Sequence, residues 1–242
     1  MSSRFCVVGA TSGTGLLITE QLLASGETVG VVARDPAKAD QVFANRVCVT
    51  RGDVTDPLSM RRSIDSGYQA IFFTVAARGG IDGRGLFESR AAIREVTCQG
   101  LINVADAARL NGFKGRLIVA SLLGVGQSSL MIRVLNVMKP GLIRNLIERE
   151  SYVRSSGIDY SIVRAPVLIN GRNAEGGLRV IGAAHPLSAG SAISRGDLAR
   201  VMILSAKHSA GSHKTFGLVS ARGPASSDEQ LIEQMESIQP ES

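Results

Sequence analysis

Residues 5–18, FCVVGATSGTGLLI, decide the fold of this chain. The segment opens with an apolar run typical of a buried β-strand, and an apolar helical pattern begins at Thr14. Between them Gly9, Gly13 and Gly15 allow a tight turn and a close approach to the backbone. The free amides at the start of a helix, together with the helix dipole, attract an anion. The segment therefore predicts a strand, a glycine-rich turn and a helix whose first turn binds phosphate.

Short apolar runs alternate with longer helical patterns over the first two thirds of the chain. Most of the runs are apolar throughout, as expected for parallel strands covered by helices on both faces. The alternation and the glycine-rich first turn predict an α/β protein with a doubly wound parallel sheet of the Rossmann type, which binds a dinucleotide. The expected strands lie at 5–8, 28–32, 47–50, 70–75, 116–120 and 159–163, and the expected helices at 14–24, 57–64, 88–110 and 129–155, the last broken at 139–141.

The regular alternation ends after residue 164. A stretch rich in glycine and small residues follows, and then a helix is expected at 197–205, a strand at 214–219 and a helix at 228–238. We expect residues 1–164 to form the dinucleotide-binding core. Residues 165–242 are expected to form a small C-terminal cap on the substrate side, integrated with the core as a single domain.

The end of the second expected strand bears on the choice between NAD and NADP. An acidic residue there binds a free ribose 2′-hydroxyl, whereas an arginine favours the 2′-phosphate of NADP. Arg34 occupies this place, and Asp35 follows it. Asp35 can serve as the acid or can cap the next helix. The sequence favours NADP, with NAD as the alternative.

The loop after the third expected strand contains Asp53 and Val54. By its position this loop walls an adenine pocket, with Asp53 bonding the exocyclic amine and Val54 packing on the ring. The alternative is that Asp53 and Asp56 only shape a turn and cap a helix.

Composition disfavours several classes of protein. The 242 residues carry a net charge of +6 without any block of like charges, and only 4% are aromatic, so no nucleic-acid partner is expected. No run of eighteen apolar residues occurs, so no transmembrane segment is expected. The histidines show no ligand spacing, so no metal site is expected.

The cysteines and the first residues of the sequence indicate the cellular compartment in which we expect the protein. Cys6, Cys48 and Cys98 are widely spaced and are interpreted as buried thiols in a reducing compartment such as the cytoplasm. The first expected strand begins after three residues, so we expect no targeting peptide.

The motifs together resemble the atypical and extended short-chain dehydrogenase/reductase superfamily, and within it the NmrA-like NAD(P)H-binding group. The resemblance rests on VVGATSGTG at 7–15, VVARDP at 31–36, GDVTD at 52–56, IVAS at 118–121, RSSGIDYSIVRAP at 154–166 and ISRGDLA at 193–199. It implies that the loop after Val75, the strand end at Ser121 and the turn at Pro166 lie along the nicotinamide half of the cofactor. With the motifs above, the expected cofactor-binding residues are Gly9, Thr11, Ser12, Gly13, Thr14, Gly15, Arg34, Asp53, Val54, Val75, Ala76, Ser121 and Pro166.

Ordinary members of this superfamily reduce carbonyls with a tyrosine that donates a proton and a lysine, four residues on, that lowers its pKa. None of the three tyrosines here has a lysine at that spacing. Atypical members often keep a lysine four residues before a glutamate, and taking Glu150 as that glutamate places Leu146 at the lysine position. The catalytic residues therefore stay unknown, with Ser121 as a candidate whose alternative role is to satisfy a strand-end amide.

Residues 129–147 are strongly apolar, with Arg133, Lys139 and Arg144 interspersed. We expect a helix packed over the edge of the sheet. The alternatives are an apolar substrate pocket and a docking surface for a protein partner or a membrane.

Three functions remain open. The first is an NADP(H)-dependent oxidoreductase acting on a small apolar or quinone-like acceptor, since hydride transfer to a flavin or quinone needs no acidic side chain. The second is a non-catalytic dinucleotide-binding regulator, assembly factor or subunit of a larger complex. The third is an epimerase or isomerase, which ranks last without the tyrosine–lysine pair.

Overall fold

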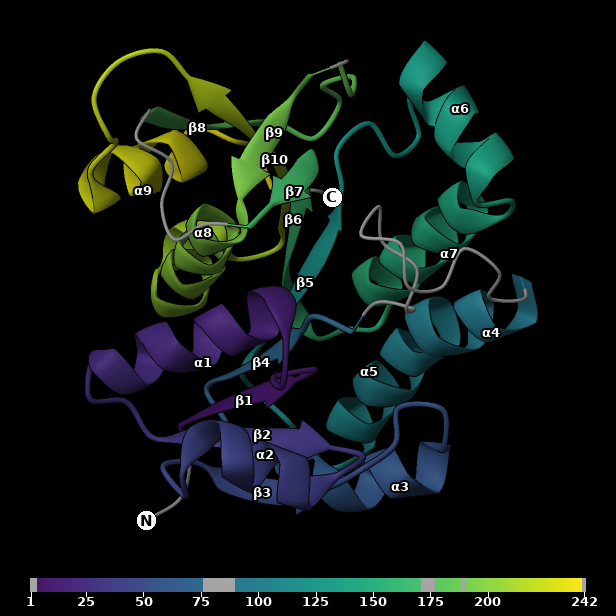
Figure 1. Ribbon diagram of the computed structural model, residues 1–242, viewed down its shortest axis with the longest axis vertical. Coiled ribbons are helices and arrows are strands. Elements are labelled where there is room, and N and C mark those ends of the chain that lie inside the picture. The colour runs from purple at the N-terminus through teal and green to yellow at the C-terminus, as the bar shows by residue number, and fades with distance from the viewer. Residues whose placement is uncertain (1–3, 76–89, 171–176, 189, 241–242) are drawn as a thin grey trace.

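The computed structural model describes residues 4–75, 90–170, 177–188 and 190–240 (Figure 1). The strands are β1 Phe5–Val8, β2 Val29–Ala33, β3 Cys48–Arg51, β4 Ala70–Phe73, β5 Arg116–Leu122, β6 Asp159–Ala165, β7 Val167–Ile169, β8 Gly177–Gly182, β9 Ala192–Ser194 and β10 Lys214–Ala221. The helices are α1 Gly13–Ala24, α2 Pro36–Phe43, α3 Pro57–Ser63, α4 Arg90–Arg94, α5 Gly100–Leu110, α6 Leu130–Met138, α7 Leu142–Ser155, α8 Arg195–Lys207 and α9 Asp228–Glu236. A π-helical turn, Glu95–Gln99, joins α4 to α5, and a 3-10 turn, Ser209–Gly211, follows α8.

One large sheet runs through the described part of the chain, with the strand order β3-β2-β1-β4-β5-β6-β10-β8. Neighbouring strands are parallel except β8, which is antiparallel to β10. The order of the first six is that of the doubly wound dinucleotide-binding sheet. It confirms the predicted fold class. In such a sheet, ligands bind beyond the carboxyl ends of the strands where the order reverses, which here lies between β1 and β4.

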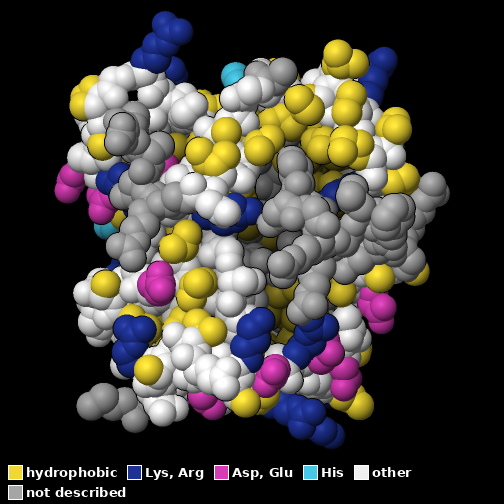
Figure 2. Space-filling view, viewed as in Figure 1, with side chains coloured by type: hydrophobic (Ala, Val, Ile, Leu, Met, Phe, Trp, Pro, Cys, Tyr) yellow, Lys and Arg dark blue, Asp and Glu magenta, His cyan; other side chains and the backbone are white. Residues whose placement is uncertain are grey.

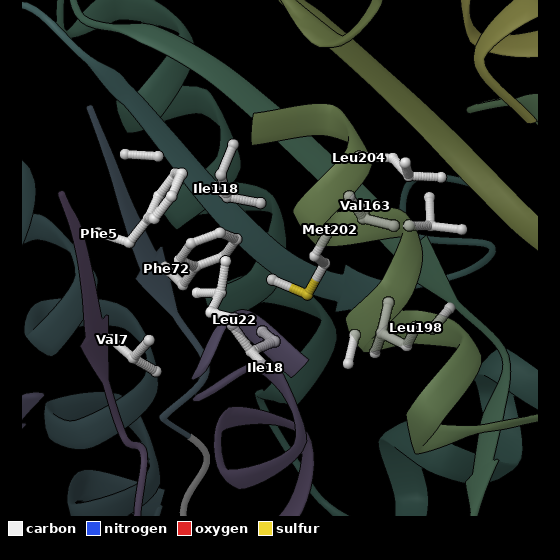
Figure 3. Close-up of a cluster of buried hydrophobic side chains, with 14 of the residues drawn as sticks. Phe5, Val7, Ile18, Leu22, Phe72, Ile118, Val163, Leu198, Met202 and Leu204 are labelled. Atoms are coloured by element: carbon white, nitrogen blue, oxygen red, sulfur yellow. The ribbon is translucent and has the colours of Figure 1, made fainter. Parts of the chain in front are cut away.

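The sheet divides the core into two layers because successive side chains of a strand point to opposite faces. On β1, Phe5 and Val7 pack on one face, together with α1, α2, α8 and α9. Cys6 and Val8 pack on the other face, together with α3, α5 and α7. Figure 3 shows the first layer, where Phe72 of β4 lies among side chains of α1 and α8. Burial on both faces explains why most of these strands are apolar throughout.

The edge strand β3 departs from this pattern. Its residues are exposed or half-buried, because β2 pairs with only one of its sides and its faces are incompletely covered. The prediction that all three cysteines are buried is therefore wrong for Cys48, which is exposed. Cys6 and Cys98 are buried as predicted.

Residues beyond β6 contribute to both the sheet and its covering layer. β10 pairs in parallel with β6, and β8 forms the other edge of the sheet. α8 lies along α1 (Figure 1), and the side-chain amide of Gln21 donates a hydrogen bond of 3.2 Å to the carbonyl of Gly196. The short strands β7 and β9 form a separate two-stranded sheet.

The apolar segment 129–155 forms two helices separated at 139–141, as the Pro140-Gly141 pair predicts. α6 packs on the rest of the molecule through Ile132, which lies with Leu123 and Leu187, and through the partly buried Met131 and Leu135. Within the described ranges, no helix is long and apolar enough to cross a membrane.

Candidate dinucleotide-binding site

The turn between β1 and α1 depends on its glycines, one because of close packing and two because of their backbone conformation. A Cβ at Gly15 would lie 2.3 Å from the carbonyl oxygen of Gly9 and 2.4 Å from Oγ1 of Thr74. Gly9 and Gly13 have φ values of +95° and +58°, a region that side chains disfavour. The backbone at the end of β1 therefore lies against the start of α1, as a glycine-rich phosphate-binding turn requires.

The first turn of α1 has no side-chain cap. Ser12, at the N-cap position, makes no side-chain hydrogen bond to it, and the turn contains no acidic residue. By contrast, Asp35, Asp56 and Ser194 cap the helices that follow them. Uncapped amides at the positive end of a helix dipole suit a bound phosphate.

Thr74, which the sequence did not single out, ties the turn to the neighbouring strand. Its hydroxyl lies 3.1 Å from the carbonyl oxygen of Val8 and 3.3 Å from that of Gly9, to which it donates. This contact fixes the glycine turn at the point between β1 and β4 where the strand order reverses.

Arg195 is a second residue that sequence reasoning missed. It is the first residue of α8, and its Nε lies 3.9 Å from the place of a Cβ on Gly13. Its guanidinium donates a hydrogen bond of 2.5 Å to the side chain of Asn170. A cation from the C-terminal region is thereby held beside the phosphate-binding turn. Its motif, ISRGDLA, carried a family resemblance but no role for the arginine.

An open pocket of about 400 Å³ lies beyond the ends of β2 and β3. Three arginines of separate elements line it: Arg34 after β2, Arg51 at the end of β3 and Arg62 on α3. The rest of its lining is Gly52, Asp53, Asp56 and Ser59. Of the three arginines, only Arg34 was expected from the sequence, and Asp53 was the other expected residue of this lining. The pocket gathers three guanidinium groups where a dinucleotide of this fold places its adenosine ribose.

The acidic residues nearby have structural partners. Asp35 accepts a hydrogen bond from the amide of Lys38 and caps α2. Asp53 accepts from both the amide and the hydroxyl of Thr55, at 3.0 Å and 2.9 Å. Asp56 accepts from the amide of Leu58 and caps α3. The turn and cap roles considered for these carboxylates are therefore present.

The other expected residues lie at the same edge of the sheet, and their contact with a cofactor stays a prediction. Val75 follows β4, and Pro166 follows β6 in a buried position. Val54 is largely buried, and its side chain packs toward Gly100 of α5. Ala76 lies outside the described residues.

Ser121, near the end of β5, belongs to a buried ionic cluster. Its hydroxyl donates a hydrogen bond of 2.6 Å to Glu150 of α7, whose carboxylate has only 1% exposure. Two nitrogens of Arg164 on β6 donate hydrogen bonds to the same carboxylate, at 2.6 Å and 3.2 Å. Arg154 adds a contact of 3.0 Å. Two guanidinium groups therefore pair with Glu150, and the hydroxyl of Ser121 donates its hydrogen bond to the same side chain.

Arg149 brings a further cation close to Ser121. Its guanidinium donates to the carbonyl oxygens of Ala120 and Thr97, at 2.7 Å and 3.1 Å. Burial lowers the pKa of Arg149 to about 10. Among the described residues its Nε has no hydrogen-bond partner.

The tyrosines lie away from Ser121. Tyr160 is buried near the start of β6 and packs edge-on against His213. Tyr152 donates a hydrogen bond of 2.6 Å to Asp106 of α5. Tyr68 precedes β4, and Leu146, at the position of the family lysine, is buried.

The strand order and the glycine turn define a Rossmann-type dinucleotide-binding protein. Residues 9–209 match the model of the NAD(P)H-binding family, and the chain belongs to that family. It is also 32% identical over 177 residues to an uncharacterized chloroplastic protein of Arabidopsis thaliana, a match that covers 70% of this chain and 60% of that protein. The chain thus spans less than two thirds of this relative's length.

Solved structures share the fold. An oxidoreductase from Lactococcus lactis has a TM-score of 0.72 at 17% identity, covering 95% of this chain and 94% of that chain. ChuY, described as an anaerobilin reductase of Escherichia coli O157:H7, has a TM-score of 0.69 at 21% identity, covering 89% of this chain and 96% of that chain. The family match and these neighbours agree with the resemblance to atypical short-chain dehydrogenase/reductases.

Proposed function

We propose that the protein binds NADP(H) in preference to NAD(H). The observation that carries this proposal is the pocket beyond β2 and β3, where Arg34, Arg51 and Arg62 converge. A 2′-phosphate bears two negative charges near neutral pH, and guanidinium groups bind phosphate through paired hydrogen bonds. Asp35, the residue that would select a free 2′-hydroxyl, uses one carboxylate oxygen to cap α2.

The rest of the site suits the other parts of the cofactor. The uncapped start of α1 offers its amides to the pyrophosphate, and Arg195 lies beside the same turn. Asp53 and Val54 stand at the adenine side, and Val75, Ser121 and Pro166 at the nicotinamide side. Residues 165–242 would close the substrate side, since Arg195 reaches the phosphate turn from this region.

The preference for NADP(H) is tested by comparing affinities for NADPH and NADH in Arg34→Ala and Arg51→Ala variants. Loss of a charged hydrogen bond costs about 1.5–3 kcal/mol, so each variant should lose NADPH affinity by about tenfold or more and keep its NADH affinity. Arg61→Ala is the matched control, because Arg61 is an exposed neighbour on α3 that does not line the pocket. Equal loss of both dinucleotides, or an equal effect in the control, would contradict the proposal.

We further propose that the protein is an oxidoreductase for a small apolar or quinone-like acceptor, working without a tyrosine–lysine pair. Bound NADPH supplies a hydride; with a proton from water, the hydride reduces a quinone to its quinol. The Ser121 hydroxyl already donates its one hydrogen bond to Glu150 and is thus poorly placed to donate to a carbonyl substrate. The distant tyrosines and the buried Leu146 support the same choice of acceptor. The oxidoreductases among proteins of this fold add support by analogy.

The same observations favour a second candidate, a non-catalytic protein that keeps the dinucleotide as a structural element or a signal. Ser121 and Glu150 would then serve only stability. The two candidates are separated by following NADPH absorbance with a quinone, a flavin and an aldehyde. Turnover with the quinone or flavin supports the oxidoreductase. Tight binding without oxidation by any of them supports the non-catalytic candidate, and turnover with the aldehyde alone contradicts the choice of acceptor.

We propose a reducing compartment, such as the cytoplasm, as the place of action. Cys6, Cys48 and Cys98 are all free thiols, which is the state expected there.

A further inference from the structure

Helix α6 is apolar on two sides. Met131, Ile132 and Leu135 pack onto the molecule around Leu123. The side that faces away exposes four further apolar side chains: Leu130 (79%), Val134 (44%), Val137 (79%) and Met138 (62%). These positions share one face because they are three or four residues apart. A surface helix of a globular protein normally carries polar residues on the face opposite the core. The exposed face of α6 carries apolar residues instead.

The charged residues described on α6 and directly after it are basic, and Glu148, the acid nearest to Arg144 on α7, forms an ion pair with Arg94. Arg133 lies on α6, Lys139 directly follows it, and Arg144 lies on α7. No aspartate or glutamate occurs in the sequence between Asp106 and Glu148. In Figure 2 the apolar side chains gather over α6, at the upper right, with basic side chains and no acidic ones beside them. The face therefore combines an apolar centre with a basic surround.

We propose that α6 is a membrane-binding helix that lies flat in the headgroup region of an anionic lipid bilayer. Leu130, Val134 and Val137 would enter the boundary between headgroups and acyl chains, and the cations would contact the lipid phosphates. An apolar face flanked by lysine and arginine is the pattern of helices that lie in the plane of a membrane surface. The proposal does not depend on which cofactor the protein binds.

The charge also argues against a second copy of this chain as the occupant. A symmetric dimer through α6 would place the same patch of both copies in contact. Arg133 and Arg144 of one copy would then lie near those of the other, and the sequence between Asp106 and Glu148 contains no acidic residue. Like charges that face each other in an interface disfavour association. Anionic lipid provides the complementary charge.

The test uses tryptophan fluorescence, because the natural chain contains no tryptophan. Val137→Trp places the reporter on the exposed face of α6, where Val137 is 79% exposed, and Leu58→Trp places it on α3, where Leu58 is 62% exposed. Vesicles of phosphatidylcholine with phosphatidylglycerol, at low salt, should shift the Val137→Trp emission to the blue. Vesicles of phosphatidylcholine alone should not, and Leu58→Trp should not respond to either.

A second measurement uses the unmodified surface. The natural protein should float with anionic vesicles in a density gradient, and Arg133→Gln or Arg144→Gln should each weaken binding by about fivefold. Arg222→Gln, which removes an exposed cation elsewhere, should bind as the natural protein does.

Three results would overturn the proposal. The first is that neither measurement detects binding to anionic vesicles. The second is that Leu58→Trp or Arg222→Gln behaves like the corresponding α6 or α7 variant, which would show unspecific adsorption. The third is a blue shift of Val137→Trp without lipid that grows with protein concentration alongside dimer formation in sedimentation, which would assign the face to a second copy.

Discussion

The hydroxyl of Ser121 and the carboxylate of Glu150 are joined by a hydrogen bond of 2.6 Å at the carboxyl edge of the sheet. Ser121 stands where the family resemblance places a residue along the nicotinamide. Glu150 is buried and is held by Arg154 and Arg164. The serine that the sequence offers for chemistry is thus part of an ionic cluster that joins β5, β6 and α7.

Glu150→Leu should strongly destabilise the fold, because it leaves Arg154 and Arg164 without their carboxylate. The loss of one partner from a buried ion pair costs about 3–5 kcal/mol, which urea unfolding measures. Glu148→Leu is the matched control on the same helix. Its partnership with Arg94 is exposed, so it should change stability by about 1 kcal/mol or less. Similar effects of the two substitutions would contradict this view of the cluster.

Gly15→Ala should disrupt the β1–α1 turn, since the new methyl group would lie 2.3 Å from the carbonyl oxygen of Gly9. We expect a lower melting temperature and loss of NADPH binding. Gly182→Ala, on β8, meets no atom within 4 Å and should leave both unchanged. If Gly15→Ala melts and binds as Gly182→Ala does, the packing described for the turn is incorrect.

Arg195→Met should weaken NADPH and NADH to the same extent, by about tenfold, because both dinucleotides share the pyrophosphate. Calorimetric titration of each cofactor measures this. Arg200→Met, on the same helix, removes an arginine that pairs with Asp228 and should leave the affinities unchanged. A selective loss of NADPH binding would instead place Arg195 at the 2′-phosphate.

Thiol labelling at pH 8 should modify one cysteine of the folded protein and all three in urea. Cys48 is exposed, whereas burial raises the pKa of Cys6 to about 12 and also raises the pKa of Cys98. Both buried thiols therefore stay protonated at this pH, and the thiolate is the reactive form. Cys48→Ser should abolish the rapid reaction, and persistent labelling of that variant would contradict the assigned burial.

Local sequence patterns predicted several strands, helices and helix breaks of the structure. The strand at 5–8 and the break near Pro140 follow directly from the residues, because burial, glycine and proline act over short distances. The exposure of Cys48 did not follow, since an edge strand looks like a central strand until its neighbours are known. The place of β10 beside β6 also depends on pairing between distant segments.

The sequence predicted only those parts of the candidate site that lie within local motifs. The glycine turn and Arg34 lie within contiguous sequence motifs, which can be recognised without the structure. Arg51, Arg62 and Arg195 join them only through the fold, because each comes from a different element. In the sequence, Glu150 served only to locate the position of the family lysine. Its hydrogen bond with Ser121 is visible only in the structure.

The proposed preference for NADP(H) is tested most directly by a calorimetric titration of the natural protein with NADPH and, separately, with NADH. We expect NADPH to bind at least about tenfold more tightly, because the proposed arginine pocket would contact the 2′-phosphate, which NADH lacks. Equal affinities, tighter binding of NADH, or no binding of either would contradict it.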